Sequence, residues 1–345
     1  MLAIGLMSGT SCDGVDAALV ETDGESIQEF IVEAHIPYPM EFQAKLLNLM
    51  KGQGNLAEIE KELTYYHFET IKQLGQTKAE IIGFHGQTVA HNPKDGICHQ
   101  IGNPHLLAHL TGTSVVSDFR RRDVARGGQG SPLVPIFHKA LMKGQPYPVA
   151  VINIGGLANV TYVSEEALIG GDTGPGNALI NDMMLKCYNR SYDKDGEIAK
   201  SSNVDYDIIK QVMQDSFFRK PPPKSLDRNH FGFVNDLVSN LSPQDAIATL
   251  TMLTVETIAK GVPSDVRAIY LCGGGAKNIT LVSWLSSKIK GIDISSIDTL
   301  GYKSDYIEAQ AFAFLAVRCI KNLPSSFQTT TGVSRDTVAG VVVHP

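Results

Sequence analysis

The sequence is poor in cysteine and lacks the spacings that build a disulfide framework or a zinc site. Five cysteines are scattered over 345 residues, and no two of them form a C-x-x-C pair. Small secreted domains carry an even, closely spaced set, and structural zinc sites need paired ligands. We expect neither feature, so these cysteines are predicted to be reduced bystanders: Cys12, Cys98, Cys187, Cys272 and Cys319.

Long hydrophobic runs are absent as well. No apolar stretch approaches the roughly 20 residues that a membrane-spanning helix needs, and no basic segment precedes the first apolar residues, as it would in a signal peptide. The net charge of −6 and the isoelectric point of about 5.9 argue against nucleic acid or an anionic membrane as the main partner. The sequence predicts a cytoplasmic protein that acts on small molecules.

The common nucleotide-binding motifs are missing too. There is no GxxxxGK[ST] segment, and no GxGxxG opens a helix, so neither a P-loop nor a Rossmann site is supported. The proline-rich segment "RKPPPKSLDRNH", 219–230, is interpreted as an ordered loop within a domain. A chain of this length is expected to form two domains with a cleft between them.

What the chain does have is an unusual first hairpin. In "LAIGLMSGTSCDGVDAALVE", 2–21, two apolar runs flank a polar turn with glycines, hydroxyls and two acids, Asp13 and Asp16. Such runs are typical of a β-hairpin, which needs only about two or three turn residues. This turn is longer and chemically richer than folding requires.

Other segments have apolar residues that recur at spacings of three and four, which predicts helices over 55–76, 178–188, 243–262 and 307–320. Because these segments alternate with short apolar runs typical of strands, we predict an α/β fold.

A weak internal repeat divides the chain in two. "AIGLMSGTSCDGVDAALV" is echoed by "AVINIGGLANVTYV" (150–163), and "IIGFHGQTV" (81–89) by "AIYLCGGGAKN" (268–278). Each half thus has a glycine-turn hairpin followed by a strand that runs into glycines. The repeat predicts a duplicated α/β domain with the ligand between the copies.

Four glycine-rich turns fall at predicted strand ends: "SGTS" (8–11), "NIGG" (153–156), "GGDTGPGN" (170–177) and "CGGG" (272–275). Glycines let backbone N–H groups converge on an anion, and a polyphosphate would use several such cradles. Alternatively, each glycine serves only turn geometry. Four such turns together favour phosphate binding.

Two acids are the main candidates for chemistry. Asp13 lies in a phosphate-type turn, where a carboxylate can hold Mg²⁺ through water. Asp172 lies between glycines and "TGPGN", where no predicted helix or strand explains it, so it is a candidate catalytic base. Alternatively, Asp172 caps the following helix. Asp16 is expected to cap or to face solvent.

Histidines and arginines form two further clusters. Five histidines fall within 85–109, but no HExxH pattern or nearby acid completes a ligand set, so the pattern does not favour a metal site. The segment His85-Gly86-Gln87-Thr88, which follows a predicted buried strand, is better placed to hydrogen-bond a polar ligand. The segment "DFRRRDVARGGQGSP", 118–132, concentrates four arginines. It is either a solvated, salt-bridged loop or a site that captures a carboxylate or phosphate of a substrate.

Together the motifs carry a family resemblance. The series "GLMSGTSCDGVDAAL", "GFHGQTV", "QIGNP", "DFRRRDVARGGQGSPLVP", "NIGGLANV", "DTGPGN", "DKDG", "ATLT" and "CGGGAKN" resembles the anhydro-N-acetylmuramic acid kinase family. That family belongs to the superfamily of sugar kinases, heat-shock ATPases and actin. The likeness runs from residue 2 to about residue 316, in the family's order.

The resemblance implies an actin-like ATPase fold of two duplicated ribonuclease-H-like domains with an interdomain cleft. It implies ATP as cosubstrate, Mg²⁺ and a homodimer. The reaction it implies opens the 1,6-anhydro ring of the sugar and phosphorylates the 6-oxygen, giving N-acetylmuramic acid 6-phosphate and ADP in peptidoglycan recycling. The implied domains are 1–137, with a tail of about 316–345 that packs back on it, and 138–315.

The resemblance also assigns residues. Asp172 matches the general base, Glu308 matches an acid near the substrate, and Asp13 would hold Mg²⁺. The ATP-binding positions are Gly9, Thr10, Ser11, Cys12, Asp13, Gly14, Val15, Asp16, Gly155, Gly156, Gly273, Gly274 and Gly275. The sugar-facing positions are Thr88, Asn103, Arg120, Arg121, Gly174 and Asn177.

The sequence departs from the family at three places. Asn181 stands where the family has an acid, and Leu226-Asp227-Arg228-Asn229 replaces Thr-Gly-Arg-Glu. The tail "TTTGVSRDTVAG" keeps Thr-Gly but little else.

Two rival functions remain open. One is an ordinary hexose or amino-sugar kinase, in which Asp172 takes a proton from a sugar hydroxyl. The other is an ATP-driven conformational protein of the chaperone or actin type, although 345 residues leave no room for a peptide-binding domain. The arginine-rich segment 118–132, called the arginine loop below, favours the anhydro-sugar kinase, because an arginine in it could pair with the lactyl carboxylate of a muramic acid.

Overall fold

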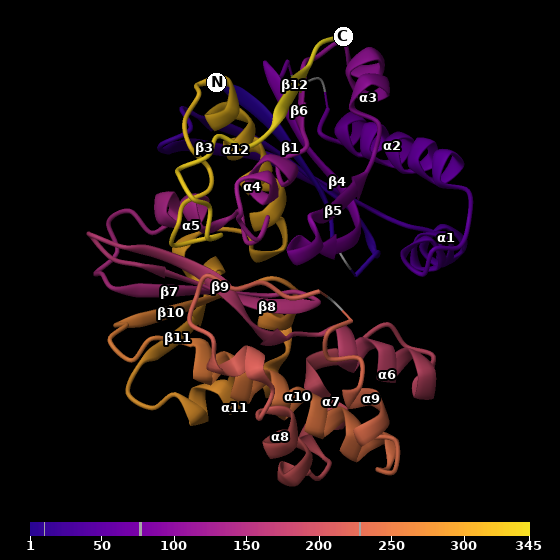
Figure 1. Cartoon of the computed structure of the whole chain (residues 1–345), viewed down its shortest axis with the longest axis vertical. Helices are drawn as coiled ribbons and strands as arrows, with labels where there is room; N and C mark the ends of the chain where they lie inside the picture. The colour runs from indigo at the N-terminus through magenta and orange to yellow at the C-terminus, as the bar shows by residue number, and fades with distance from the viewer. Residues whose placement is uncertain (10, 76–77, 228) are drawn as a thin grey trace. The chain divides into compact units, whose positions relative to one another are not determined.

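The computed structural model describes residues 1–9, 11–75, 78–227 and 229–345. The chain divides into two compact units (Figure 1). The first unit comprises Met1–Lys143 and Tyr306–Pro345, and the second comprises Gly144–Asp305. The sequence-based limits had divided the helix over 307–320 at about residue 316, whereas in the structure that helix lies wholly in the first unit.

The first unit is built on a mixed sheet with the strand order β12-β6-β4-β1-β2-β3, and β5 pairs with β4. Strands β1, β2 and β3 form an antiparallel meander, whereas β4 runs parallel to β1 and β6 parallel to β4. The strands are β1 Leu2–Ser8, β2 Gly14–Thr22, β3 Ile27–Pro37, β4 Ile81–Asn92, β5 Ile97–Ile101, β6 Val115–Ser117 and β12 Val341–Val343.

The second unit repeats this arrangement with the strand order β11-β10-β7-β8-β9. Strands β7, β8 and β9 form an antiparallel meander, β10 runs parallel to β7, and β11 parallel to β10. The strands are β7 Val149–Ile154, β8 Leu157–Val163, β9 Leu168–Pro175, β10 Ala268–Cys272 and β11 Asp293–Ser296. The matching orders confirm the duplicated α/β fold that the internal repeat predicted.

The helices of the first unit are α1 Met40–Met50, α2 Leu56–Gln73, α3 Pro104–Thr111, α4 Arg121–Ala125, α5 Pro135–Leu141 and α12 Ile307–Ile320. Those of the second are α6 Ala178–Tyr188, α7 Glu197–Lys200, α8 Tyr206–Val212, α9 Val234–Leu237, α10 Pro243–Gly261 and α11 Ile279–Lys288. The four helices predicted from apolar spacing correspond to α2, α6, α10 and α12.

Helix α12 belongs to the first unit because its backbone lies against the centre of that sheet. A Cβ atom added at Gly5 would lie 1.8 Å from the carbonyl oxygen of Ala309, and one at Gly83 would lie 2.0 Å from that of Phe312. Such distances leave no room for a side chain at either of these two positions. The two glycines, in β1 and β4, therefore let α12 pack directly on the sheet.

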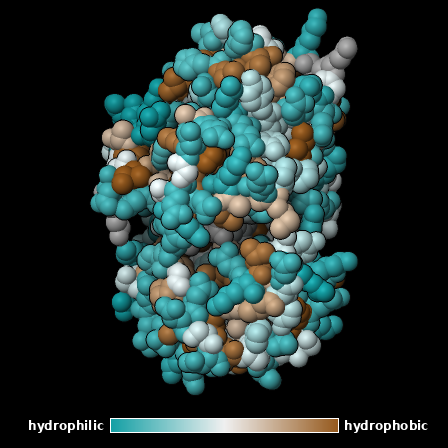
Figure 2. Space-filling model, turned by 90° about the vertical axis from the view of Figure 1, so that its right-hand side faces the viewer, coloured by the Kyte–Doolittle hydropathy of each residue, from teal (hydrophilic) through white to brown (hydrophobic). Residues whose placement is uncertain are grey.

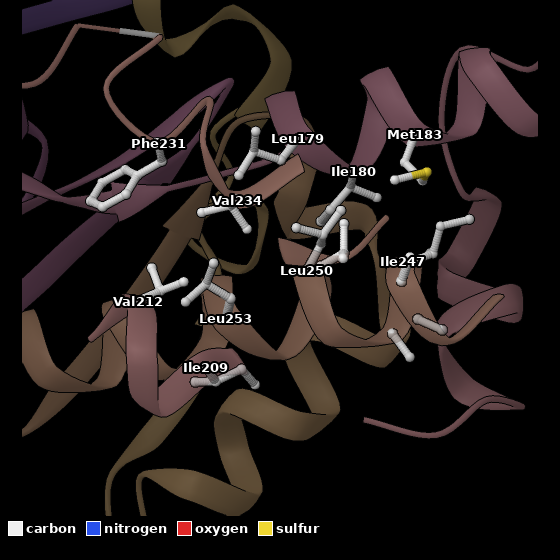
Figure 3. Close-up of a cluster of buried hydrophobic side chains, with 14 of the residues drawn as sticks. Leu179, Ile180, Met183, Ile209, Val212, Phe231, Val234, Ile247, Leu250 and Leu253 are labelled. Carbon is white, nitrogen blue, oxygen red and sulfur yellow. The ribbon is translucent and has the colours of Figure 1, made fainter. Parts of the chain in front are cut away.

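The second unit has its own hydrophobic core between its helices (Figure 3). Side chains from α6, α8 and α10, such as Leu179, Ile209 and Leu250, point toward one another in it. Phe231 and Val234 join the same cluster. This core therefore anchors the chain just after the proline-rich loop 219–230.

The face of the molecule in Figure 2 is covered mainly by hydrophilic residues, with small apolar spots among them. Among the helices that the structure describes, none is both long enough and apolar enough to cross a membrane.

Candidate active site

The polar turn between β1 and β2 begins after Ser8, the last residue of β1, which pairs with Gln87 of the parallel strand β4. The Ser8 hydroxyl donates a hydrogen bond to Oε1 of Gln87 over 2.6 Å, and Nε2 of Gln87 donates to the carbonyl oxygen of Gly9 over 3.1 Å. The Gln87 side chain thus ties the start of the turn to the neighbouring parallel strand. Ligands of open α/β sheets commonly bind at such carboxyl ends.

Tyr38 forms a hydrogen bond at the start of this turn. Its hydroxyl lies 2.8 Å from the Ser8 hydroxyl, and because Ser8 gives its hydrogen to Gln87, Tyr38 is the donor. Burial raises the pKa of Tyr38 well above 10, so this donor stays protonated. No signal in the sequence marks Tyr38, because no motif links it to Ser8 and only the fold brings the two hydroxyls together.

The turn itself directs two oxygen-bearing side chains outward and one apolar side chain inward. Ser11 and Asp13 are exposed, and the Ser11 hydroxyl donates to Oδ1 of Asp13 over 2.7 Å. Cys12 is buried with Val15 in a hydrophobic cluster, and its φ of 55° is left-handed. Of the predicted ATP-binding positions, Cys12 and Val15 can therefore contribute only backbone groups.

The remaining positions of this predicted loop have local roles as well. A Cβ at Gly14 would lie 2.5 Å from the carbonyl oxygen of Ile36, so packing against β3 requires glycine. Asp16 lies in β2 and pairs with Nδ1 of His35 over 2.8 Å. Thr10 lies outside the residues that the structure describes.

Two glycine turns of the second unit are joined to each other. The carbonyl oxygen of Gly155 accepts a hydrogen bond from the backbone N–H of Asn177 over 2.8 Å, and that of Gly156 accepts from Gly176 over 3.0 Å and from Ala178 over 3.1 Å. The "NIGG" and "GPGN" turns are therefore one structure, although they are far apart in the sequence.

The third glycine turn of the second unit, "CGGG", lies beside the "NIGG" turn. The reason is that β10 runs parallel to β7, with Cys272 opposite Asn153. A Cβ at Gly273, whose φ is 77°, would lie 2.3 Å from Oδ1 of Asn153. A Cβ at Gly275 would lie 2.3 Å from a methyl group of Ile154. Both glycines are thus required for packing.

Three other glycines have open space beside them. A Cβ at Gly274 would meet no atom within 4 Å, and those at Gly9 and Gly155 would meet only ordinary contacts at 3.5 Å and 3.6 Å. None of the three has a positive φ. Their backbone is therefore the part of these turns that a ligand can approach closely.

Asp172 lies in the middle of β9, where the sequence had predicted neither a helix nor a strand. It is only 5% exposed, and its Oδ2 accepts a hydrogen bond from the backbone N–H of Leu226 over 2.8 Å. The following helix α6 has Asn177 at its N-cap position. The alternative interpretation of Asp172 as a helix cap is therefore wrong.

Two neighbouring side chains of the arginine loop, Arg120 and Arg121, bind different partners. Arg120 donates from Nε to Nε2 of His85 over 3.0 Å and from Nη1 to the carbonyl oxygen of Gly130 over 2.7 Å. Arg121, whose side chain is 71% exposed, pairs with Asp118 over 2.8 Å. Arg121 is therefore the more accessible of the two predicted sugar-facing arginines.

Both ring nitrogens of His85 form hydrogen bonds within the protein. Because Nε2 accepts from Arg120, Nδ1 carries the hydrogen and donates to the carbonyl oxygen of Gly86 over 2.8 Å. Burial, with the Arg120 charge as a second cause, holds the pKa of His85 well below 6.5. The prediction that His85 hydrogen-bonds a ligand is not supported, because a neutral His85 instead orients Arg120.

The C-terminal segment holds the same loop from another side, which the sequence did not reveal. The fully buried Asp123 accepts from the backbone N–H of Gly130 over 2.6 Å and from the Thr331 hydroxyl over 2.6 Å. The backbone N–H of Gln129 donates to the carbonyl oxygen of Thr331 over 2.7 Å. The retained Thr-Gly of the tail therefore has a structural partner.

The other sugar-facing candidates also carry structural bonds. Oδ1 of Asn103 caps α3 by accepting from the backbone N–H of Leu106 over 2.9 Å. The Thr88 hydroxyl accepts from Gln100 over 3.3 Å. Nδ2 of Asn177 donates to the carbonyl oxygen of Ile154 over 3.1 Å.

The last two predicted residues lie in different units. A Cβ at Gly174 would lie 2.7 Å from Thr257, so this glycine permits α10 to approach β9. Glu308 is half-buried in the first turn of α12, where the positive end of the helix dipole favours a carboxylate.

Histidine-rich segment 85–109 does not form a metal centre in the part of the chain that the structure describes. There, no group of three or more His, Cys, Asp or Glu side chains is arranged to hold a metal ion. Nδ1 of His91 instead lies 3.2 Å from the sulfur of Cys98. An ion held by one carboxylate through water, as predicted for Asp13, needs no such group.

Known proteins match this chain over its whole length. A family model described as anhydro-N-acetylmuramic acid kinase matches residues 1–345. An anhydro-N-acetylmuramic acid kinase of Rhodopseudomonas palustris is 41% identical over 368 residues and one of Azorhizobium caulinodans is 43% identical over 370, each with 100% of both chains covered.

Solved structures are more distant. The activator of the 2-hydroxyisocaproyl-CoA dehydratase from Clostridium difficile is 14% identical, with 93% of this chain and 96% of that chain covered and a TM-score of 0.46. The ROK hexokinase from Thermus thermophilus is 13% identical, with 91% and 97% covered and a TM-score of 0.39.

Proposed function

The chain belongs to the anhydro-N-acetylmuramic acid kinase family, and we propose that it uses ATP to open the 1,6-anhydro ring of 1,6-anhydro-N-acetylmuramic acid and to phosphorylate its 6-oxygen. The products are N-acetylmuramic acid 6-phosphate and ADP. The observation that carries this proposal is the buried Asp172 carboxylate in β9, just before the joined glycine turns of the second unit.

Asp172 is the general base in this proposal. Water attacks the anomeric carbon, and Asp172 takes the proton of that water, much as the base of an inverting glycosidase does. The bond between the anomeric carbon and the 6-oxygen breaks, and the 6-oxygen bonds to the γ-phosphorus of ATP while ADP leaves. The leaving oxygen needs no separate acid, because its developing charge passes to the phosphorus.

The glycine turns are proposed to hold ATP. The open backbones at Gly9, Gly155 and Gly274 let N–H groups approach phosphate or adenosine, and phosphoryl transfer depends mainly on such positioning and charge stabilisation. The exposed oxygens of Ser11 and Asp13 suit Mg²⁺, which keeps several of its waters. When bound, the ion neutralises phosphate charge.

The sugar is proposed to contact Thr88, Asn103, the arginine loop, Gly174, Asn177 and Glu308. Within that group, Arg121 is the candidate for the lactyl carboxylate of the muramic acid, because its side chain is 71% exposed while its Nη2 pairs with Oδ2 of Asp118. A guanidinium suits bidentate capture of a carboxylate. Arg120 instead supports the loop.

The family resemblance also supports a proposal on location, oligomeric state and metabolic role. We propose that the protein is a cytoplasmic homodimer that acts in peptidoglycan recycling and amino-sugar degradation. Sedimentation of the purified protein tests the dimer.

The direct test is an assay of ADP release with Mg-ATP and three sugars: 1,6-anhydro-N-acetylmuramic acid, N-acetylmuramic acid and N-acetylglucosamine. We expect turnover of the anhydro sugar alone. Asp172→Asn should lose about 10²–10⁴-fold in kcat, because the base is removed while the shape is kept. Asp236→Asn, an exposed acid in α9, is the matched control. Turnover of the open-ring sugars would instead support the ordinary amino-sugar kinase.

A further inference from the structure

The arginine loop is bound to the C-terminal segment 325–338, which lies beside α4 in the first unit (Figure 1). The Thr331 hydroxyl donates to Oδ2 of Asp123 over 2.6 Å, and Nη1 of Arg126 donates to the Thr337 hydroxyl over 3.0 Å. These partners are 208 and 211 positions apart in the sequence. The contact between loop and segment is therefore a product of the fold.

Asp123 is the buried centre of this contact. Its Oδ1 accepts from the backbone N–H of Gly130 while its Oδ2 accepts from Thr331. A Cβ at Gly128 would lie 2.1 Å from Oδ1 of Asp123 and 2.7 Å from a methyl group of Val333. No side chain fits at Gly128, so the loop and the segment pack closely here.

The same carboxylate is connected to both arginines that were predicted to face the sugar. Asp123 lies two residues after Arg121 in the short helix α4. Gly130, whose N–H binds Asp123, accepts a hydrogen bond at its carbonyl oxygen from Nη1 of Arg120 over 2.7 Å. Asp123 thus holds the backbone next to Arg121 and the residue that binds Arg120.

The C-terminal segment is itself fixed at both ends. Helix α12 precedes it and packs on the sheet, and strand β12 follows it and pairs antiparallel with β6. Strand β6 ends at Ser117, immediately before the arginine loop. Within the segment, Ser326 and Thr337 form an antiparallel bridge. A segment held in this way can keep the loop in one conformation.

We propose that Asp123 and Thr331 are positioning residues for the sugar, which hold the arginine loop so that it presents the Arg121 guanidinium to the lactyl carboxylate. This inference rests on the proposed sugar-facing role of Arg121. A side chain binds a ligand more tightly when its backbone is already ordered, because less conformational freedom is lost on binding. Asp123 and Thr331 are buried and need not touch the sugar.

The test is steady-state kinetics of Thr331→Val and Thr331→Ser with the anhydro sugar and ATP. Valine has nearly the shape of threonine but cannot donate to Asp123, whereas serine can. We expect Thr331→Val to raise the KM of the sugar about fivefold, with kcat and the KM of ATP within about twofold of wild type, because one buried hydrogen bond of the loop is lost. Thr331→Ser should restore the wild-type KM.

Thr330→Val is the matched control. Thr330 is the neighbouring residue and is also buried, but its hydroxyl bonds with the backbone of Phe327, outside the arginine loop. Thr330→Val removes a hydroxyl from the same segment and should leave the KM of the sugar unchanged.

A double-mutant cycle tests whether Thr331 acts through Arg121. Thr331→Val combined with Arg121→Ala should raise the KM of the sugar no further than Arg121→Ala alone, because no guanidinium is left to position. If Thr331→Val does not fold, Arg126→Gln takes its place in the cycle, since it removes the bond to Thr337 at a half-buried position.

Three results would overturn the inference: an unchanged sugar KM in Thr331→Val, an equal rise in Thr330→Val, or a double variant whose KM rises by the product of the two single effects. Arg121→Ala separates this inference from the proposed function. If its sugar KM is unchanged, the sugar-facing role of Arg121 is wrong and the inference fails with it. A raised KM in Arg121→Ala with an unchanged KM in Thr331→Val rejects only the positioning role.

Discussion

Nε of Arg120 donates a hydrogen bond to Nε2 of the buried, neutral His85 over 3.0 Å. The next residue, Arg121, points elsewhere and pairs with Asp118 at the surface. Two arginines that look equivalent in the sequence thus have different roles, which substitutions should separate.

Arg120→Ala is expected to lower the free energy of unfolding by about 1–3 kcal/mol, because it leaves a buried ring nitrogen of His85 without its donor. Arg121→Ala should change stability by less than about 0.5 kcal/mol, since its side chain is mostly exposed. It should instead raise the KM of the anhydro sugar about tenfold, as loss of a charged hydrogen bond does. Urea unfolding and steady-state kinetics measure both. An unchanged KM in Arg121→Ala would refute the assignment of the lactyl carboxylate.

Two glycines of "CGGG", Gly273 and Gly274, should differ in what they tolerate. Gly274→Ala should fold with wild-type stability, because its methyl group meets no atom within 4 Å, yet raise the KM of ATP several-fold by blocking the close approach of the nucleotide. Gly273→Ala is the contrasting variant. Its methyl group would meet Oδ1 of Asn153 at a φ of 77°, so we expect a loss of at least about 1–3 kcal/mol in stability. Wild-type ATP kinetics in Gly274→Ala would remove "CGGG" from the nucleotide site.

Asp13→Asn should raise the Mg²⁺ concentration needed for half-maximal activity by about tenfold, because a neutral amide attracts the hydrated ion less than a carboxylate does. A Mg²⁺ titration at saturating ATP and sugar measures this. Glu21→Gln, which neutralises an exposed acid of β2, is the matched control and should leave the titration unchanged. An identical titration for Asp13→Asn would place the ion elsewhere.

Stability should fall as the solution is acidified below about pH 6.5, the ordinary pKa of histidine. Burial lowers the pKa of His67 to about 4 and that of His138 to about 3 in the folded protein. Between these values and about 6.5 the unfolded chain binds more protons than the folded one, so each such histidine removes up to about 1.4 kcal/mol per pH unit. At higher pH both states are neutral and this dependence disappears.

Urea unfolding at several pH values tests this expectation. His67→Phe keeps the ring contact with Phe84 but cannot be protonated, so its stability should fall less steeply with acidification than that of wild type. Equal slopes for the two proteins would show that His67 titrates normally in the folded state.

Much of the fold could be predicted because it rests on local patterns. The apolar spacing in 178–188 and 243–262 gave helices that the structure bounds almost identically, as α6 Ala178–Tyr188 and α10 Pro243–Gly261. The glycine-turn hairpin predicted over 2–21 is the antiparallel pair β1–β2. Hydrophobic period and turn chemistry are properties of neighbouring residues, so the chain alone reveals them.

The roles of particular glycines and polar side chains could not be predicted in the same way. Gly5 and Gly83 allow a helix from the other end of the chain to lie on the sheet, and no local turn marks them. His85 looked like a ligand-binding residue until the structure placed Arg120 on its free nitrogen. The roles proposed for Asp172 and the sugar-facing residues stay predictions.

By itself, then, the sequence determined the class of fold, the duplication and the family, since these depend on motifs that are contiguous in the chain. Only the tertiary structure decided which glycines are packed and which are open, which arginine is accessible, and that Lys224 and Leu226 close on Asp172. The reason is physical: hydrogen bonds, burial and charge act over a few ångströms, and folding brings within that range residues that lie more than fifty positions apart, such as Asp172 and Leu226.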